Sequence, residues 1–193
     1  MKLAITDRTL RMPPVEAMHI ARALGYDGVE VCVDRLDGNE HPVLALDGGS
    51  WLKEQAEAAG LAVASISAGV LSRHSLCSTN AAECQALADL LRRLLEACRT
   101  SGASTLHLPL HGASEPHHPG DRQRTVEALR PLVQQAEAAG VTLALECIEP
   151  ADSARGWAAA LKSPSVKLAF DVGNARAAGF DVAAELQARQ GLL

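Results

Sequence analysis

A short phrase that recurs along the chain restricts its fold more than any other feature. Each copy is an Ala- and Leu-rich stretch with helical periodicity, then a glycine, then a short run rich in Val, Ile and Leu. The glycines of the four clearest copies are Gly25, Gly60, Gly102 and Gly140. A glycine in that place is typical of a helix C-terminus, where the backbone takes a positive φ. The run that follows has the length and composition of a strand. The chain is therefore predicted to alternate helices with strands.

Two further strands complete the pattern. One is the opening segment, and the other follows a Ser-Pro pair that ends the preceding helix. The predicted strands lie near residues 2–6, 28–33, 61–67, 104–110, 141–147 and 166–171, in a single domain that covers residues 1–193. Strict alternation of strand and helix favours parallel strands with helical crossovers. Two architectures have that order: an open doubly wound sheet and a closed (β/α)₈ barrel.

The two faces of the last three strands decide between these architectures. Residues alternate between faces with a period of two, and this separates Leu106, Leu108, Leu143, Leu145, Val166 and Leu168 from Thr105, His107, Thr142, Glu146, Lys167 and Asp171. A doubly wound sheet has helices on both sides and would be apolar on both faces; no G-x-G-x-x-G loop follows any strand either. A barrel has helices outside only, and its interior turns polar toward the C-terminal strand ends. We predict a (β/α)₈ TIM barrel, present here as a partial barrel of about six βα units.

Composition excludes several classes of protein. With 193 residues, 48% hydrophobic and 21% charged, the chain can bury the core of one globular domain. Its net charge of −5 gives no basic footprint for nucleic acid. No apolar run reaches the ~18 residues of a membrane span, and the N-terminus does not resemble a signal peptide. The five cysteines form no C-x-x-C pair, which indicates reduced thiols. We expect a cytoplasmic protein with neither nucleic acid nor a membrane as partner.

Polar side chains gather at the predicted C-terminal strand ends. Those expected to point inward near that rim are Glu30, Asp34, His107, His111, Glu146 and Asp171. An acid such as Glu146 inside an apolar strand needs a partner or a metal ion. Paired carboxylates can hold a divalent cation that polarises a carbonyl, and one of them can remove a proton from the neighbouring carbon. Glu30 and Asp34 have an equally good structural interpretation as ion-pair partners of Lys167.

The other candidates also have structural interpretations. Asp171 could serve only as the cap of the next helix. His107 and His111 could bind substrate oxygens or bond to a neighbouring loop. Glu149 begins a loop and has a smaller chance of contacting substrate. The residues alone leave these alternatives open.

Taken together, these segments resemble the xylose isomerase-like TIM-barrel superfamily of sugar phosphate isomerases and epimerases. The likeness is carried by LGYDGVEV (24–31), LAVASISAG (61–69), LALE (143–146) and, above all, FDVGNARAAGFDVAAEL (170–186). The last segment is similar to that of L-ribulose-5-phosphate 3-epimerases and hexulose-6-phosphate isomerases. The resemblance spans essentially the whole chain.

The resemblance implies roles for particular residues. In this superfamily the matching Glu and Asp ligate a divalent metal, which carries over to Glu146 and Asp171, and Glu146 is also the acid/base. The metal would be Mn²⁺ or Mg²⁺, with Zn²⁺ or Co²⁺ as alternatives. Asn174 stands where many relatives have a histidine. The expected substrate-binding residues are His107, His111, Asn174 and Glu149.

The implied function is a metal-dependent sugar or sugar-phosphate isomerase or epimerase that works through an enediolate. In such barrels, strands seven and eight add a His ligand and a second Glu that serves as the opposing acid/base. A (β/α)₈ barrel takes ~250 residues, so we expect either a fragment or a chain completed by a second copy in a homo-oligomer. One alternative is a non-catalytic remnant that binds a sugar or a protein. Another, an apurinic-site endonuclease, is disfavoured by the acidic charge and the missing histidines.

Overall fold

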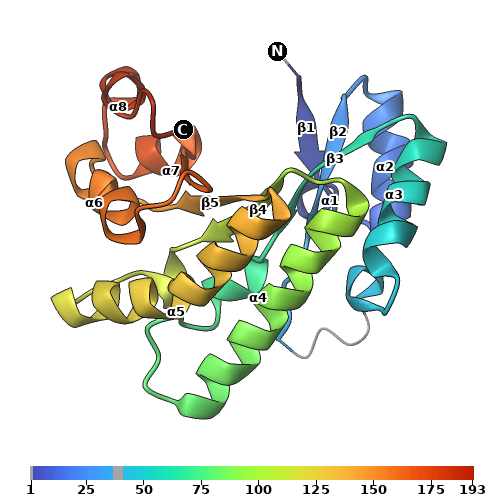
Figure 1. Cartoon of the computed structure of the whole chain (residues 1–193). Coiled ribbons are helices and arrows are strands. Elements are labelled where there is room, and N and C mark those ends of the chain that lie inside the picture. Colours follow the sequence, from blue (N-terminus) through green and yellow to red (C-terminus); the bar gives the residue numbers. More distant parts are fainter. Residues whose placement is uncertain (1, 37–40) are drawn as a thin grey trace.

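The computed structural model describes residues 2–36 and 41–193, with a parallel sheet at its centre (Figure 1). The strands follow one another in the order β1-β2-β3-β4-β5-β6. Their bounds are β1 Ala4–Thr6, β2 Gly28–Cys32, β3 Ala62–Ser67, β4 Thr105–Pro109, β5 Thr142–Glu146 and β6 Val166–Ala169. Each strand pairs in parallel with the next in the sequence. Six parallel βα units in an open sheet are thereby confirmed.

Helices connect the strands and pack beside one another in sequence order. Their bounds are α1 Asp7–Leu10, α2 Pro14–Ala23, α3 Gly48–Ala59, α4 Ala81–Ser101, α5 Pro119–Ala139, α6 Ala151–Leu161, α7 Val172–Ala177 and α8 Val182–Ala188, with short 3-10 turns at Pro42–Leu44, Gly69–Ser72 and Gly112–Ser114. Each helix from α2 to α5 contacts the next one, so together α2 to α6 form one outer layer against the sheet (Figure 1). Within the described residues, no helix has the length and apolar character needed to cross a membrane.

The recurring glycines act as the sequence predicts. Gly60 follows α3 as its C-cap with φ of 69°, and Gly140 follows α5 as its C-cap with φ of 67°. Both values lie in the left-handed region, which costs a side chain with a Cβ about 1–2 kcal/mol. The chain thus leaves each helix in a fixed direction and enters the following strand.

The two faces of the sheet differ as expected. Leu106 lies beside Leu143 in the sheet register, and Leu145 lies beside Leu168; all four side chains are buried in the core. The opposite face carries the polar side chains. Because all strands are parallel, their C-terminal ends meet at one edge of the sheet, and the candidate site lies there.

Strand β6 is shorter than predicted. It ends at Ala169, and Asp171 is the N-cap of α7, with its side chain accepting a hydrogen bond from the Asn174 backbone N–H. The cap satisfies a backbone donor that the first turn of a helix leaves free. The start of α7 therefore takes the chain out of the sheet before residue 171.

Candidate functional site

Glu146 is the last residue of β5 and the centre of the candidate site. Its side chain is buried, with 6% of the residue exposed. His107 Nε2 lies 3.0 Å from Oε2, and Asn174 Nδ2 donates a hydrogen bond of 3.0 Å to Oε1. His111 Nε2 lies 3.6 Å from the same Oε1. The buried carboxylate is therefore paired on both oxygens, as a buried charge requires.

Asp171 reaches the same cluster from the start of α7. Its Oδ1 accepts a 2.8 Å hydrogen bond from the Asn174 backbone N–H, and its Oδ2 accepts a 3.1 Å bond from Asn174 Nδ2. That Nδ2 also bonds to Glu146. A single amide group thus joins the two carboxylates. Asp171 is at once a helix cap and a member of the cluster, so the two interpretations of this residue do not exclude each other.

His107 lies between carboxylates from two different strands. Its Nδ1 is 3.0 Å from Ser67 Oγ and 3.9 Å from Glu30 Oε2, and Ser65 Oγ donates to that same Glu30 oxygen over 2.6 Å. Neither serine was among the residues predicted for the site, although their spacing of two places them on one face of β3. Lys167 was considered as a partner of Glu30; it donates instead to a backbone carbonyl near the C-terminus.

His107 and Glu146 each stabilise the charged form of the other. Burial by itself lowers the pKa of His107, but the hydrogen bond to Glu146 and the nearby charges of Glu30 and Glu146 outweigh it and raise the pKa. Burial by itself raises the pKa of Glu146, but the hydrogen bond and charge of His107, with the charge of His111, outweigh it and lower the pKa. The pair is therefore stabilised as imidazolium and carboxylate.

A pH dependence of stability follows from these two directions. The raised pKa of His107 contributes stability that is complete below its ordinary value of 6.5 and is lost as the pH rises through the folded value. The lowered pKa of Glu146 contributes stability that is present above 4.5 and is lost as the pH falls through its folded value. In chelator-treated protein, we expect His107→Gln to flatten the decline of unfolding free energy above pH 6.5. Urea unfolding at a series of pH values measures it; an unchanged slope would contradict the pairing.

Further acidic side chains lie at the C-terminal ends of β1 and β2, on the same edge of the sheet as Glu146. Asp7 is buried and accepts a 3.1 Å hydrogen bond from the Cys32 N–H, and burial raises its pKa to about 6. Asp34 accepts from the Cys32 thiol over 3.2 Å and lies 3.5 Å from Arg8 Nη1. Asp7 was missed because it opens a four-residue helix, which the sequence pattern did not reveal. The described edge is thus rich in carboxylates from both halves of the sheet.

The side chain of Glu149 points away from the Glu146 cluster, toward α5 and α6. Its Oε2 accepts hydrogen bonds from Arg122 Nη2 over 2.9 Å and from Ser153 Oγ over 2.5 Å, and its Oε1 accepts from Trp157 Nε1 over 3.3 Å. The Arg122 guanidinium also stacks on the Trp157 ring, 4.5 Å from its centroid. The carboxylate is therefore bound by α5 and α6 rather than joined to Glu146, and its contact with substrate stays a prediction.

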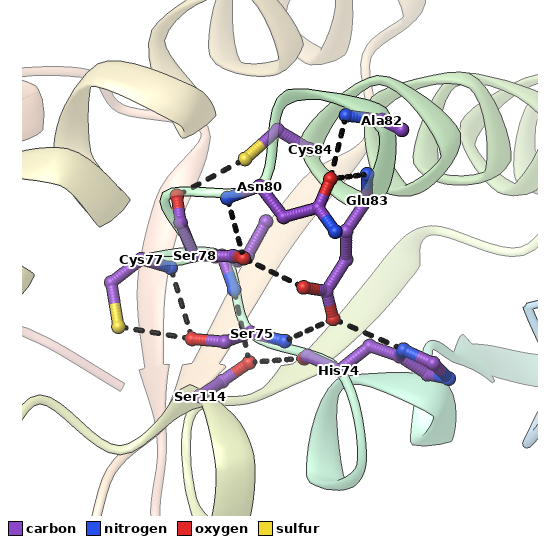
Figure 2. A network of polar contacts seen from close by, with 10 residues as sticks. His74, Ser75, Cys77, Ser78, Asn80, Ala82, Glu83, Cys84 and Ser114 are labelled. Carbon is purple, nitrogen blue, oxygen red and sulfur yellow. Dashed lines mark hydrogen bonds and ion pairs between the residues drawn. The ribbon is translucent and has the colours of Figure 1, made fainter.

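A second polar network fastens the loops that follow β3 and β4 (Figure 2). Glu83 Oε1 accepts from His74 and from the Ser75 N–H, and its Oε2 accepts from Ser78 Oγ over 2.6 Å. Ser114, from the loop after β4, donates to the His74 carbonyl over 2.8 Å. These bonds fix two loops beside the rim, which suits a site that needs stable walls.

Glu146 and Asp171 are the two carboxylates of the cluster that could hold a metal ion. Both carboxylates accept a hydrogen bond from the same Asn174 Nδ2, over 3.0 Å for Glu146 and 3.1 Å for Asp171. Mg²⁺ and Mn²⁺ favour such oxygen ligands and keep several waters. Among the described residues, no group of three or more His, Cys, Asp or Glu side chains is arranged to hold a metal. The two acids would therefore supply part of a coordination shell.

Comparison with known proteins places the chain in a family. Residues 18–192 match the family described as xylose isomerase-like TIM barrel. The chain belongs to this family. Among curated proteins, the L-ribulose-5-phosphate 3-epimerase UlaE of Salmonella paratyphi A is 30% identical over 191 residues, covering 92% of this chain and 65% of that protein. UlaE of Escherichia coli (strain K12 / DH10B) is 29% identical over 188 residues, covering 90% and 64%. The chain thus spans slightly less than two thirds of these relatives.

Solved structures of two sugar epimerases share the fold. A D-psicose 3-epimerase crystallised in the presence of D-fructose aligns with a TM-score of 0.82 at 18% identity, covering 100% of this chain and 71% of that one. An L-ribulose 3-epimerase aligns with a TM-score of 0.78 at 18% identity, covering 100% and 68%. The predicted TIM-barrel fold of xylose isomerase-like type is therefore confirmed.

Proposed function

We propose that the protein is a divalent-metal-dependent sugar or sugar-phosphate isomerase or epimerase in which Glu146 moves a proton at the carbon next to the substrate carbonyl. The observation that carries this proposal is the joining of Glu146 to Asp171 through Asn174, at the C-terminal strand ends where barrels of this type place their active sites. The names of the relatives, which are 3-epimerases of ketoses or ketose phosphates, support the same chemistry.

Glu146 and Asp171 are the residues that would hold the metal, with Mn²⁺ or Mg²⁺ as the best match to oxygen ligands and Zn²⁺ or Co²⁺ as alternatives. A bound divalent cation supplies positive charge that polarises a carbonyl and stabilises the negative charge of an enediolate. The Asn174 amide, which touches both acids, sets their relative orientation.

The ionised form of Glu146 is the form that a base needs. Its lowered pKa keeps it ionised at neutral pH, the form that accepts a proton from carbon. His107 Nε2 lies 3.0 Å from Oε2, and Asn174 Nδ2 donates a hydrogen bond of 3.0 Å to Oε1, so the orientation of the carboxylate is fixed from both sides. His111 Nε2 is 3.6 Å from Oε1, too far for a hydrogen bond, and is available to donate to a substrate oxygen. We place His107, His111, Asn174 and Glu149 among the substrate contacts.

Proton exchange with solvent tests the proposal directly. The protein is incubated in D₂O with Mn²⁺ and L-ribulose 5-phosphate, D-psicose or D-fructose, and NMR follows the hydrogen next to the carbonyl. Exchange without inversion requires one base, whereas inversion requires a second on the opposite face. We expect metal-dependent deuterium incorporation into at least one ketose. No incorporation with Mn²⁺, Mg²⁺, Co²⁺ or Zn²⁺ would contradict the proposal.

A further inference from the structure

Helix α8 contacts α6 and α7 without burying any of its own residues. All seven of its residues are described, and none of them is buried. The next residue, Arg189, has only 1% of its surface exposed. A guanidinium is rarely buried so completely unless it is paired. Arg189 is therefore the one side chain at the end of this helix that is fully buried in the molecule.

Arg189 connects three parts of the chain. Its Nη2 donates to the Glu149 carbonyl over 2.5 Å and to Glu185 Oε2 over 2.9 Å. Its guanidinium stacks on the Phe170 ring, 4.8 Å from the centroid. Glu149 lies three residues after Glu146, and Phe170 directly precedes Asp171. One side chain therefore bridges the segments that carry the two acids of the site.

A small cavity lies between these groups. Arg189 lines it together with Glu146, Asp171 and Asn174, and its volume of about 10 Å³ is close to what a single water molecule needs. Nε and Nη1 of Arg189 are buried and have no hydrogen-bond partner among the described residues. A buried guanidinium with spare donors at the wall of the cluster is a costly feature, which a positioning role would explain.

We propose that Arg189 is a positioning residue that sets the spacing between Glu146 and Asp171. It does so by holding the turn after β5 through the Glu149 carbonyl and the end of β6 through Phe170. The expected effect of Arg189 on metal binding rests on the proposed function. Its effect on the rigidity of the turn after β5 and of the end of β6 does not.

Arg155 provides the matched control. Its Nη2 donates to the Ala188 carbonyl, so Arg155→Met also removes an arginine contact to the α8 segment but touches neither Glu149 nor Phe170. Hydrogen–deuterium exchange of peptides covering residues 143–152 and 168–176 is compared in wild type, Arg189→Met, Arg189→Lys and Arg155→Met. Mn²⁺ affinity is measured in parallel by titration.

We expect Arg189→Met to speed exchange in both peptides and to weaken Mn²⁺ binding about tenfold, the low end for a residue that supports metal ligands. Arg189→Lys, which keeps the charge without the planar stack, should show a smaller change in the same direction, and Arg155→Met none. Equal exchange in Arg189→Met and Arg155→Met would overturn the inference. If Arg189→Met does not fold, equal exchange in Arg189→Lys and Arg155→Met would do so. A wild type that fails to bind Mn²⁺ would count against the proposed function, while faster exchange in both peptides would still support the positioning role.

Discussion

Replacing Glu146 with glutamine is expected to slow metal-dependent proton exchange by about 10²–10⁴-fold, the range that a positioned acid or base contributes. Glutamine has the same shape, but its amide cannot accept a proton from carbon. The rate is measured by NMR in D₂O on the ketose that the wild type labels best. Mn²⁺ is kept saturating, so that weaker metal binding is separated from the loss of the base.

Glu127→Gln is the matched control for this experiment. Glu127 lies on the exposed surface of α5, where it accepts a hydrogen bond from Gln123. The same chemical change there should leave the exchange rate at the wild-type value. If Glu146→Gln kept a rate close to that of Glu127→Gln, Glu146 would not be the base, and the proposed chemistry would need another residue.

Replacing Trp157 with alanine is expected to cost about 3–5 kcal/mol of unfolding free energy, as for other buried aromatic side chains. Trp157 has 0% of its surface exposed. Its indole N–H bonds to Glu149, and Arg122 stacks on its ring. The loss therefore combines a cavity in the core with release of the two charged groups beside it.

Trp51→Ala is the comparison for that measurement. Trp51 is only partly buried against the core, so its removal leaves a smaller cavity and a smaller loss of stability. Urea unfolding of both variants, followed by circular dichroism, gives the two free energies. Equal losses of unfolding free energy would contradict the larger cavity expected at Trp157.

Much of the fold is predictable because its signals are local. The glycine that ends each helix needs only a positive φ, and Gly60 and Gly140 show it in the structure. The alternation of leucine with polar residues in β4 and β5 depends on the period of a strand alone. The parallel order then follows from the strand-helix alternation, and it brings His107 and His111 to Glu146.

The remainder of the site depends on contacts between distant parts of the chain. The bond between Ser67 and His107 joins residues on two strands, and the bond between Arg189 and the Glu149 carbonyl crosses 40 positions. Side-chain rotamers and local caps decide such contacts, and neither appears in a hydrophobic pattern. The same reason explains why Glu149 turns toward Arg122 although it follows Glu146 closely in the sequence.

The central claim is that Glu146 and Asp171 together bind a divalent metal, and thermal unfolding with and without Mn²⁺ tests it most directly. A ligand bound only by the native state stabilises it by about 2.7 kcal/mol at a concentration one hundred times its dissociation constant. We predict that Mn²⁺ raises the unfolding midpoint of the wild type and leaves that of the Glu146→Ala/Asp171→Ala double variant unchanged. An unchanged midpoint in the wild type, or an equal rise in the double variant, would contradict the claim.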